Sequence, residues 1–262
     1  MLQVAEPFQN IFRSCGLDSP QAVARFFLKD NPTKTAVVVK RAAWPGPDGF
    51  AVFYKQYEYQ PPSWKFVGRK SKARCEFENY EVFQRLGILS AERIACGEGR
   101  DAIGRLRRAF IITREIPNAK TLVEFFQSEC RDRTKPEIRK IRAQSIRQLV
   151  EIMRRLHSAS FFHHDFVWRN ILVTQDPPDK PRLWLIDCPR GKFDSWSPMR
   201  RRRRLKDLAS LDKVASQLCT RTERLLFLKN YLAMQRVDVE VKRLAQQILT
   251  YRKNRWPEDW KE

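Results

Sequence analysis

The stretch Phe162–Gly191, which reads FHHDFVWRNILVTQDPPDKPRLWLIDCPRG, decides how the rest of the chain is interpreted. Two short runs rich in β-branched and large apolar residues, ILVT and RLWLI, lie on either side of a turn rich in Pro and Asp. This pattern is typical of a β-hairpin. The stretch therefore predicts two paired strands with polar residues before and after them.

Three polar residues around this hairpin suggest its chemistry. Asn170 enters the first strand and Asp187 leaves the second, and these two positions of a hairpin lie at the same end. Their oxygen-bearing side chains suit Mg²⁺, which completes its shell with water and phosphates. Asp165 lies in the loop before the first strand, where it can orient a hydroxyl. Each pattern alone is common, but their conjunction predicts phosphoryl transfer, with Asp165 catalytic and Asn170 and Asp187 binding metal and nucleotide.

Composition limits the class of protein and of partner. The 262 residues suffice for one large domain or for two small lobes. Lys and Arg number 51 against 30 Asp and Glu, a formal net charge of +21. Such a charge favours a nucleic acid, an anionic membrane face or a polyanionic substrate as partner. With 42% hydrophobic residues, however, the chain is too apolar to be a disordered basic tail.

The cysteines and the hydropathy pattern predict a reduced, cytosolic setting. The six cysteines are scattered without a C-x-x-C pair, which indicates neither a zinc site nor a disulfide framework. The N-terminus has no basic start followed by an apolar run, and no stretch approaches the length needed to cross a bilayer. Any membrane contact is therefore expected to be peripheral.

The first part of the chain predicts a helix and a hairpin. The run AVARFFL after Asp18-Ser19-Pro20 favours a helix, although it is also compatible with a strand. TAVVVKRAA, ending at Ala43, and FAVFYKQYEY, starting at Phe50, predict two strands joined by a turn rich in Pro and Gly.

Lys55 lies within the second of these strands, among apolar and aromatic neighbours. It is either a solvent-facing residue of a half-exposed sheet or a lysine that reaches the α- and β-phosphates of a nucleotide. In the second case a carboxylate must hold it. The predicted helix SKARCEFENYEVFQRLG supplies Glu76 near its start, and we assign Glu76 as this partner, with Glu78 and Glu81 as surface charges. No G-x-G-x-x-G precedes Lys55, so residues 31–34 are the only candidate cover for the phosphates.

The next segments predict a linker and a long helix. ERIACGE and RRAFIITREI read as strands, and Ile111–Glu115 is expected to be an edge strand that leads into the linker between lobes. In kinase-like folds the adenine hydrogen-bonds to this backbone, so Glu115 is assigned to the nucleotide. A helix is predicted from Thr134 to Leu156, with a capping box formed by Thr134 and Glu137 and with its Arg and Lys residues on the face opposite its apolar residues. Leucine-patterned helices are predicted after the hairpin.

Two basic stretches have alternative interpretations. Arg200–Arg204 is either a solvated face or nuclear-type address, or a phosphate-binding surface where an acceptor approaches. WKFVGRKSKAR, starting at Trp64, interleaves basic and aromatic residues and is either a solvated loop or a surface for a membrane or polyanion.

With these residues in place, the chain resembles the Kdo/WaaP family of lipopolysaccharide core kinases, and its InaA-like members in particular. The resemblance covers roughly residues 35–235 and depends on the segments FYKQY, SKARCEFENYEVFQRLGI, HHDFVWRNILV, LIDCPRG, RRLKDLASLDK and RLLFLKNYL. Two departures are His164, where an arginine is usual, and Asp187-Cys188-Pro189, where protein kinases have Asp-Phe-Gly. Neither departure removes a metal ligand or the acid that orients the hydroxyl.

The resemblance implies a two-lobed, protein-kinase-like α+β fold. We expect a small, β-rich N-lobe over residues 1–115 and a mainly helical C-lobe over residues 116–262. The implied activity is ATP- and Mg²⁺-dependent phosphorylation of a heptose or Kdo hydroxyl in the lipopolysaccharide inner core. The expected location is the cytoplasmic face of the inner membrane, bound peripherally, with lipopolysaccharide as partner and no specific nucleic acid. The sequence leaves two alternatives open. One is a kinase for another acceptor, either a protein or a small molecule, and the other is a catalytically silent protein that binds polyanions.

Overall fold

In a computed structural model, described for residues 1–28, 36–47, 49–176 and 180–260, the chain divides into two compact units. The first comprises Met1–Arg85, Ser90–Ile116 and Asp187–Arg190, and the second comprises Leu86–Leu89, Pro117–Ile186 and Gly191–Glu262. The short segment Asp187–Arg190 therefore packs with the first unit, although it directly follows the predicted hairpin of the second.

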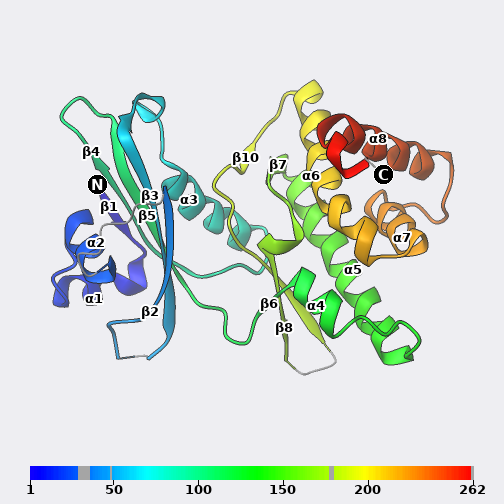
Figure 1. Cartoon of the computed structure of the whole chain (residues 1–262), viewed down its shortest axis with the longest axis horizontal. Coiled ribbons are helices and arrows are strands. Elements are labelled where there is room, and N and C mark those ends of the chain that lie inside the picture. The colour runs from blue at the N-terminus through cyan, green and yellow to red at the C-terminus, as the bar shows by residue number, and fades with distance from the viewer. Residues whose placement is uncertain (29–35, 48, 177–179, 261–262) are drawn as a thin grey trace. The chain divides into compact units, whose positions relative to one another are not determined.

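An antiparallel five-stranded sheet in the order β1-β4-β5-β3-β2 forms the centre of the first unit (Figure 1). The strands are β1 (Leu2–Val4), β2 (Val37–Ala43), β3 (Ala51–Ser63), β4 (Arg93–Arg100) and β5 (Leu106–Arg114). Because β5 pairs with both β4 and β3, the expectation that Ile111–Glu115 forms an edge strand is wrong. Its residues Ala109 to Ile112 are all buried, as befits a central strand.

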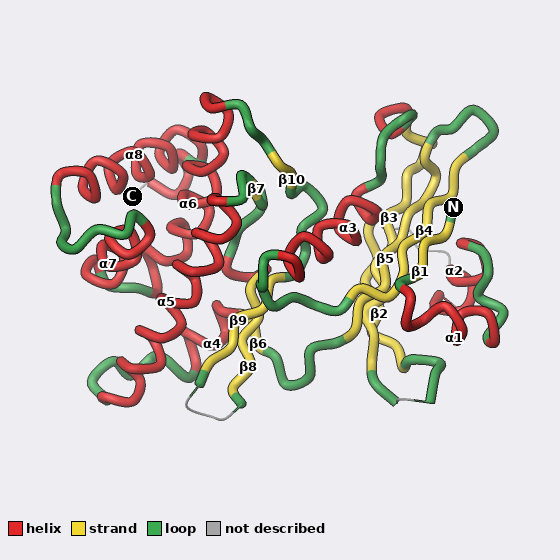
Figure 2. The backbone as a smooth tube through the Cα atoms, turned by 180° about the vertical axis from the view of Figure 1, so that it is seen from behind, coloured by secondary structure: helices red, strands yellow, loops and turns green. Residues whose placement is uncertain are grey.

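Helices cover both faces of this sheet (Figure 2). The short helix α1 (Gln9–Ser14) and α2 (Pro20–Leu28) share an apolar core with one face, to which β3 contributes Val52 and Tyr54. The run AVARFFL is thus helical, and the Ser19 hydroxyl caps it by accepting the amide of Ala22 at 3.1 Å. On the other face lies α3 (Lys72–Arg85), which confirms the predicted helix. Since side chains alternate along a strand, Lys55 points to the α3 face.

The second unit is mainly helical (Figure 1). Its helices are α4 (Leu122–Ser128), α5 (Pro136–Ser158), α6 (Ser197–Leu218), α7 (Arg221–Tyr231) and α8 (Val239–Arg255). The predicted hairpin is confirmed as β8 (Ile171–Gln175) and β9 (Pro181–Leu185), with Ile171 opposite Leu185. A short strand β6 (Lys120–Thr121) completes its sheet, and β7 (Phe161–Phe162) pairs with β10 (Lys192–Phe193).

Two details predicted for α5 are wrong. The helix begins after Lys135 with Pro136 in its first turn, and the hydroxyl of Thr134, one residue too early to cap it, bonds to Asp132 at 2.5 Å instead. The side chain of Arg142 does not lie on a polar face but is buried, where it makes two hydrogen bonds, 2.7 and 2.9 Å long, to the carboxylate of Glu223 on α7. Capping boxes occur instead at α4 and α7.

Candidate active site

Lys55 on β3 is held by two carboxylates of its own unit. Its ammonium nitrogen lies 3.2 Å from Oε2 of Glu76 on α3 and 2.6 Å from Oδ1 of Asp187. The Lys55 and Glu76 side chains are 17% and 4% exposed, whereas that of Asp187 is 40% exposed. The solvent-facing interpretation of Lys55 is therefore wrong. The aliphatic part of the Lys55 side chain extends from β3 and brings the ammonium group to Glu76 and Asp187, which come from distant parts of the sequence.

The electrostatics of this group favour a permanently charged lysine. Burial alone would lower the pKa of Lys55, but the carboxylates of Glu76 and Asp187 and the Tyr57 hydroxyl raise it above its usual value. Burial raises the pKa of Glu76, and the ammonium of Lys55 offsets part of that effect. A lysine fixed in this way presents a full positive charge at neutral pH, which suits it to contact phosphate oxygens.

The helix α3 positions Asp187 as well as Lys55. The Tyr80 hydroxyl contacts Oε1 of Glu76 at 3.3 Å and accepts the amide of Asp187 at 3.1 Å. The Asn79 amide donates to the carbonyl of Cys188 at 2.7 Å. Sequence reasoning missed Asn79 and Tyr80, although residues three and four positions after Glu76 must share its face of the helix. One helix face thus holds the lysine and the segment that carries Asp187.

Asp187 itself has a left-handed backbone, with φ of 57°. Aspartate tolerates this region better than most residues do. One of its carboxylate oxygens contacts Lys55, and within the described part of the chain the other makes no hydrogen bond or ion pair. The carboxylate thus retains an oxygen for a further ligand.

The loop between β7 and β8 belongs to the second unit and is fixed by the buried Asp207 of α6. The carboxylate of Asp207 accepts the amides of His163 and His164 at 2.9 and 2.8 Å. The amide nitrogen of Asn170 donates to the carbonyl of Asp165 at 3.0 Å, so the Asn170 side-chain oxygen is the atom left for a cation. The role of Asp207 was not predicted from the sequence, because this residue lies inside a leucine-patterned helix and no neighbouring residue indicates its bonds to His163 and His164.

Asp165 and His164 differ in their surroundings. Among the described residues the Asp165 carboxylate has no hydrogen-bond or ion-pair partner, so it is free to accept a proton from a bound hydroxyl. His164 has φ of 66°. Burial lowers the pKa of His164 to about 4, with nearby cations such as Lys206 acting in the same direction and Asp207 opposing it. The imidazole is therefore neutral at pH 7, in contrast to the arginine usual at this position.

The remaining assignment, Glu115, lies just after β5. Its amide donates to the carbonyl of Ala51 at 2.8 Å, and its carboxylate binds the Arg41 guanidinium through two hydrogen bonds, 2.8 and 2.7 Å long. The amide of Glu115 is therefore engaged within the sheet of the first unit. The stretch proposed to cover the phosphates, residues 31–34, lies outside the described residues.

Comparisons with known proteins agree on one family. A model of the family described as "Lipopolysaccharide kinase (Kdo/WaaP) family" matches residues 62–231, more than half of the chain. A 3-deoxy-D-manno-octulosonic acid kinase of Haemophilus influenzae (strain 86-028NP) is 29% identical over 126 residues, which are 46% of this chain and 48% of that protein. The matched stretch thus spans about half the length of this relative.

A solved structure described as "WaaP in complex with acyl carrier protein" resembles the whole chain. The TM-score is 0.73 at 23% identity, with 100% of each chain covered. At this identity the likeness concerns the fold, and it confirms the predicted two-lobed α+β architecture. Together with the family match, it leads to one conclusion: the chain belongs to the lipopolysaccharide kinase (Kdo/WaaP) family, as its motifs predicted.

Proposed function

We propose that this protein transfers the γ-phosphoryl group of ATP, with Mg²⁺, to a sugar hydroxyl of the lipopolysaccharide inner core. The observation that carries the proposal is the position of Lys55, whose ammonium contacts both Glu76 and Asp187. A buried, charged lysine beside an acid with an open oxygen is the arrangement that phosphoryl transfer needs, because catalysis depends on positioning and charge neutralisation.

The proposed roles follow from the chemistry of each side chain. In the reaction, the bond from the γ-phosphorus to the β,γ-bridging oxygen breaks and a bond to the acceptor oxygen forms. Asp165 orients the acceptor hydroxyl and takes up its proton, since its carboxylate is otherwise unengaged among the described residues. Lys55 binds phosphate oxygens of the nucleotide, and Glu76 holds Lys55 in place. The backbone of Glu115 is assigned to the adenine.

Asp187 and Asn170 have the donor atoms that suit Mg²⁺. Each offers one oxygen, a carboxylate oxygen not used by Lys55 and an amide oxygen oriented by the bond from Asn170 to Asp165. These two residues would hold the ion. When bound, Mg²⁺ neutralises negative charge on the phosphate oxygens.

The proposal also includes the acceptor sugar and the location of the protein. The name of the Haemophilus relative favours 3-deoxy-D-manno-octulosonic acid over heptose as the acceptor sugar. Within the described residues, no helix is long and apolar enough to cross a membrane. Arg200 and Arg202 on α6 are exposed, and we propose that they draw the protein to the anionic cytoplasmic face of the inner membrane, where it binds peripherally. No specific nucleic-acid partner is required.

Magnesium-dependent ATP turnover by the purified chain tests the proposed roles. Asp187→Ala should abolish it, and Asp165→Ala should lower it by several orders of magnitude while ATP binding is largely kept. The control is Asp176→Ala, which removes an exposed acid beside the same hairpin and should leave turnover unchanged. Turnover that survives Asp187→Ala and needs no metal contradicts the proposal. Absent turnover combined with polyanion binding would instead identify a silent binder.

A further inference from the structure

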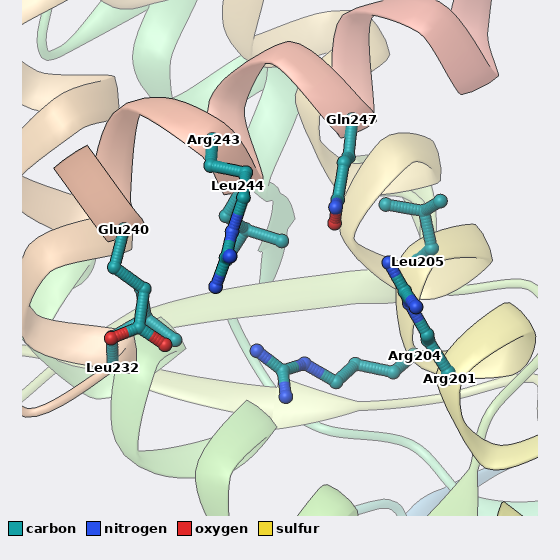
Figure 3. Close-up of a pocket in the computed structure, with 8 residues that line it drawn as sticks. All are labelled: Arg201, Arg204, Leu205, Leu232, Glu240, Arg243, Leu244 and Gln247. Carbon is teal, nitrogen blue, oxygen red and sulfur yellow. The ribbon is translucent and has the colours of Figure 1, made fainter.

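A cavity of about 340 Å³ lies between α6, the end of α7 and α8 in the second unit. Figure 3 shows side chains from these elements converging on it. None of the candidate catalytic or nucleotide-binding residues lines this cavity. The described lining residues are Arg201, Arg204, Leu205, Leu232, Glu240, Arg243, Leu244 and Gln247.

Three guanidinium groups dominate the lining. Arg201 and Arg204 are three residues apart on α6 and so share a helix face, and Arg243 comes from α8. Within the described part of the chain none of the three forms an ion pair, in contrast to Arg203 of the same run, which lies 2.5 Å from Asp194. Glu240 is the one acid among the described lining residues, so two positive charges remain uncompensated.

Arg204 is held in place by an aromatic ring. Its guanidinium lies over the ring of Tyr231, 5.1 Å from the ring centroid. Tyr231 is buried, and its hydroxyl is 2.8 Å from Nδ1 of His157. Stacking on an anchored ring restricts the guanidinium, while its N–H donors have no partner among the residues that the structure describes. A group that is already ordered loses less entropy when it binds a ligand.

The charge and size of the cavity define its ligand. The planar guanidinium of arginine matches the oxygens of phosphate. A phosphomonoester carries a charge of about −1.5 to −2 at neutral pH. This charge balances the two uncompensated positive charges of the lining better than the single charge of a carboxylate or a phosphodiester does. The volume is near the lower end of the range of about 300–1,000 Å³ for small-molecule sites. Leu205 and Leu244 provide apolar walls, and the Gln247 amide can bond to a hydroxyl.

We propose that α6 and α8 form a second ligand site, which binds a phosphomonoester carried on a sugar-sized body. The same chemistry occurs in a soluble sugar phosphate and in a phosphorylated lipid headgroup. The proposal does not depend on the proposed kinase activity, because it concerns binding in the absence of ATP by residues outside the candidate active site.

Titration calorimetry on the full chain without nucleotide tests this site. Glucose 6-phosphate should bind, and glucose should not. Arg243→Gln should weaken binding about tenfold or more, as expected for loss of a charged hydrogen bond. The matched control is Lys242→Gln, which removes the same charge from the adjacent, exposed position of α8 and should change affinity less than about twofold. Glu240→Gln should strengthen binding, since it removes the competing acid.

Vesicles distinguish the two sources of the ligand. The probes are phosphatidylcholine vesicles with either phosphatidic acid, a phosphomonoester, or phosphatidylglycerol, a phosphodiester. Preference for phosphatidic acid, competed by glucose 6-phosphate and lost in Arg243→Gln, identifies a headgroup site. Binding of glucose 6-phosphate without that preference identifies a soluble ligand. Equal effects of Arg243→Gln and Lys242→Gln, or no binding of glucose 6-phosphate at millimolar concentration, would overturn the proposal.

Discussion

The ammonium of Lys55 lies 2.6 Å from Oδ1 of Asp187, although 132 residues separate the two in sequence. The same nitrogen lies 3.2 Å from Glu76, so one cation bridges a strand, a helix and the segment after the β8–β9 hairpin. The helix α3 supports both ends of this bridge, through Tyr80 to Asp187 and through Glu76 to Lys55. The phosphate-binding part of the proposed site is therefore a network within one unit.

Lys55 and Glu76 should act as a coupled pair. We expect Lys55→Met and Glu76→Gln each to weaken ATP use strongly, and the double variant to lose much less than the product of the two effects, because each single change already disrupts the shared network. Steady-state kinetics in ATP with all four proteins measures this coupling. Small effects that multiply fully would show that the ion pair serves only the stability of the strand.

The hydroxyl of Tyr80 should matter for positioning. Tyr80→Phe removes the acceptor for the Asp187 amide and the contact with Glu76, so we expect a lower kcat with a nearly unchanged melting temperature. The matched control is Tyr59→Phe, whose hydroxyl is buried without a hydrogen-bond partner among the described residues. Since Tyr59→Phe deletes no bond, kcat should stay unchanged. Equal kcat values for both variants would show that the Tyr80 hydroxyl does not position Asp187 for catalysis.

The ion pair between the buried Arg142 and the half-buried Glu223 should contribute strongly to the stability of the second unit. Burial alone would raise the pKa of Glu223, but hydrogen bonds from Arg142 and from the Thr220 amide hold it below its usual value. Glu223→Gln should lower the free energy of unfolding at pH 7 by on the order of 3 kcal/mol. The control Glu129→Gln breaks the largely exposed pair with Lys120 and should cost less than about 1 kcal/mol.

The effect of Glu223→Gln on the free energy of unfolding should depend on pH in a defined direction. A carboxyl whose pKa is depressed by folding stabilises the protein fully above its unfolded pKa of about 4.3, and this contribution is lost as the pH falls through the folded value. The deficit of Glu223→Gln relative to the parent, measured by urea unfolding, should thus be constant from pH 7 to about pH 5 and should shrink below about pH 4. A deficit independent of pH would show that the charge of Glu223 is not what stabilises the pair.

Local patterns were sufficient to predict the parts of the fold that depend on neighbouring residues. The hairpin β8–β9, the helix α3 and the strand around Lys55 follow from alternation, turn residues and helical spacing. The choice of Glu76 as the partner of Lys55 was also possible, because that acid lies near the start of the predicted helix.

Long-range pairing explains what the sequence did not reveal. The central place of β5 depends on β4 and β3, which pair with it from opposite sides. The buried Arg142 looked like a surface residue because its partner Glu223 lies 81 residues further on. Asp207 likewise gave no local signal of its bonds to the loop between β7 and β8. Charged residues are buried only when paired, and that pairing is a property of the folded chain.

Phosphate transfer to lipopolysaccharide core is the decisive measurement of the proposed activity. Lipopolysaccharide core lacking the inner-core phosphate would be incubated with the protein, ATP and Mg²⁺, and its mass measured. We expect the core to gain one phosphate group, and we expect no gain without Mg²⁺ or with Asp165→Ala or Asp187→Ala. No gain on the core while an aminoglycoside or a protein is phosphorylated, or a gain that persists in both variants, would contradict it.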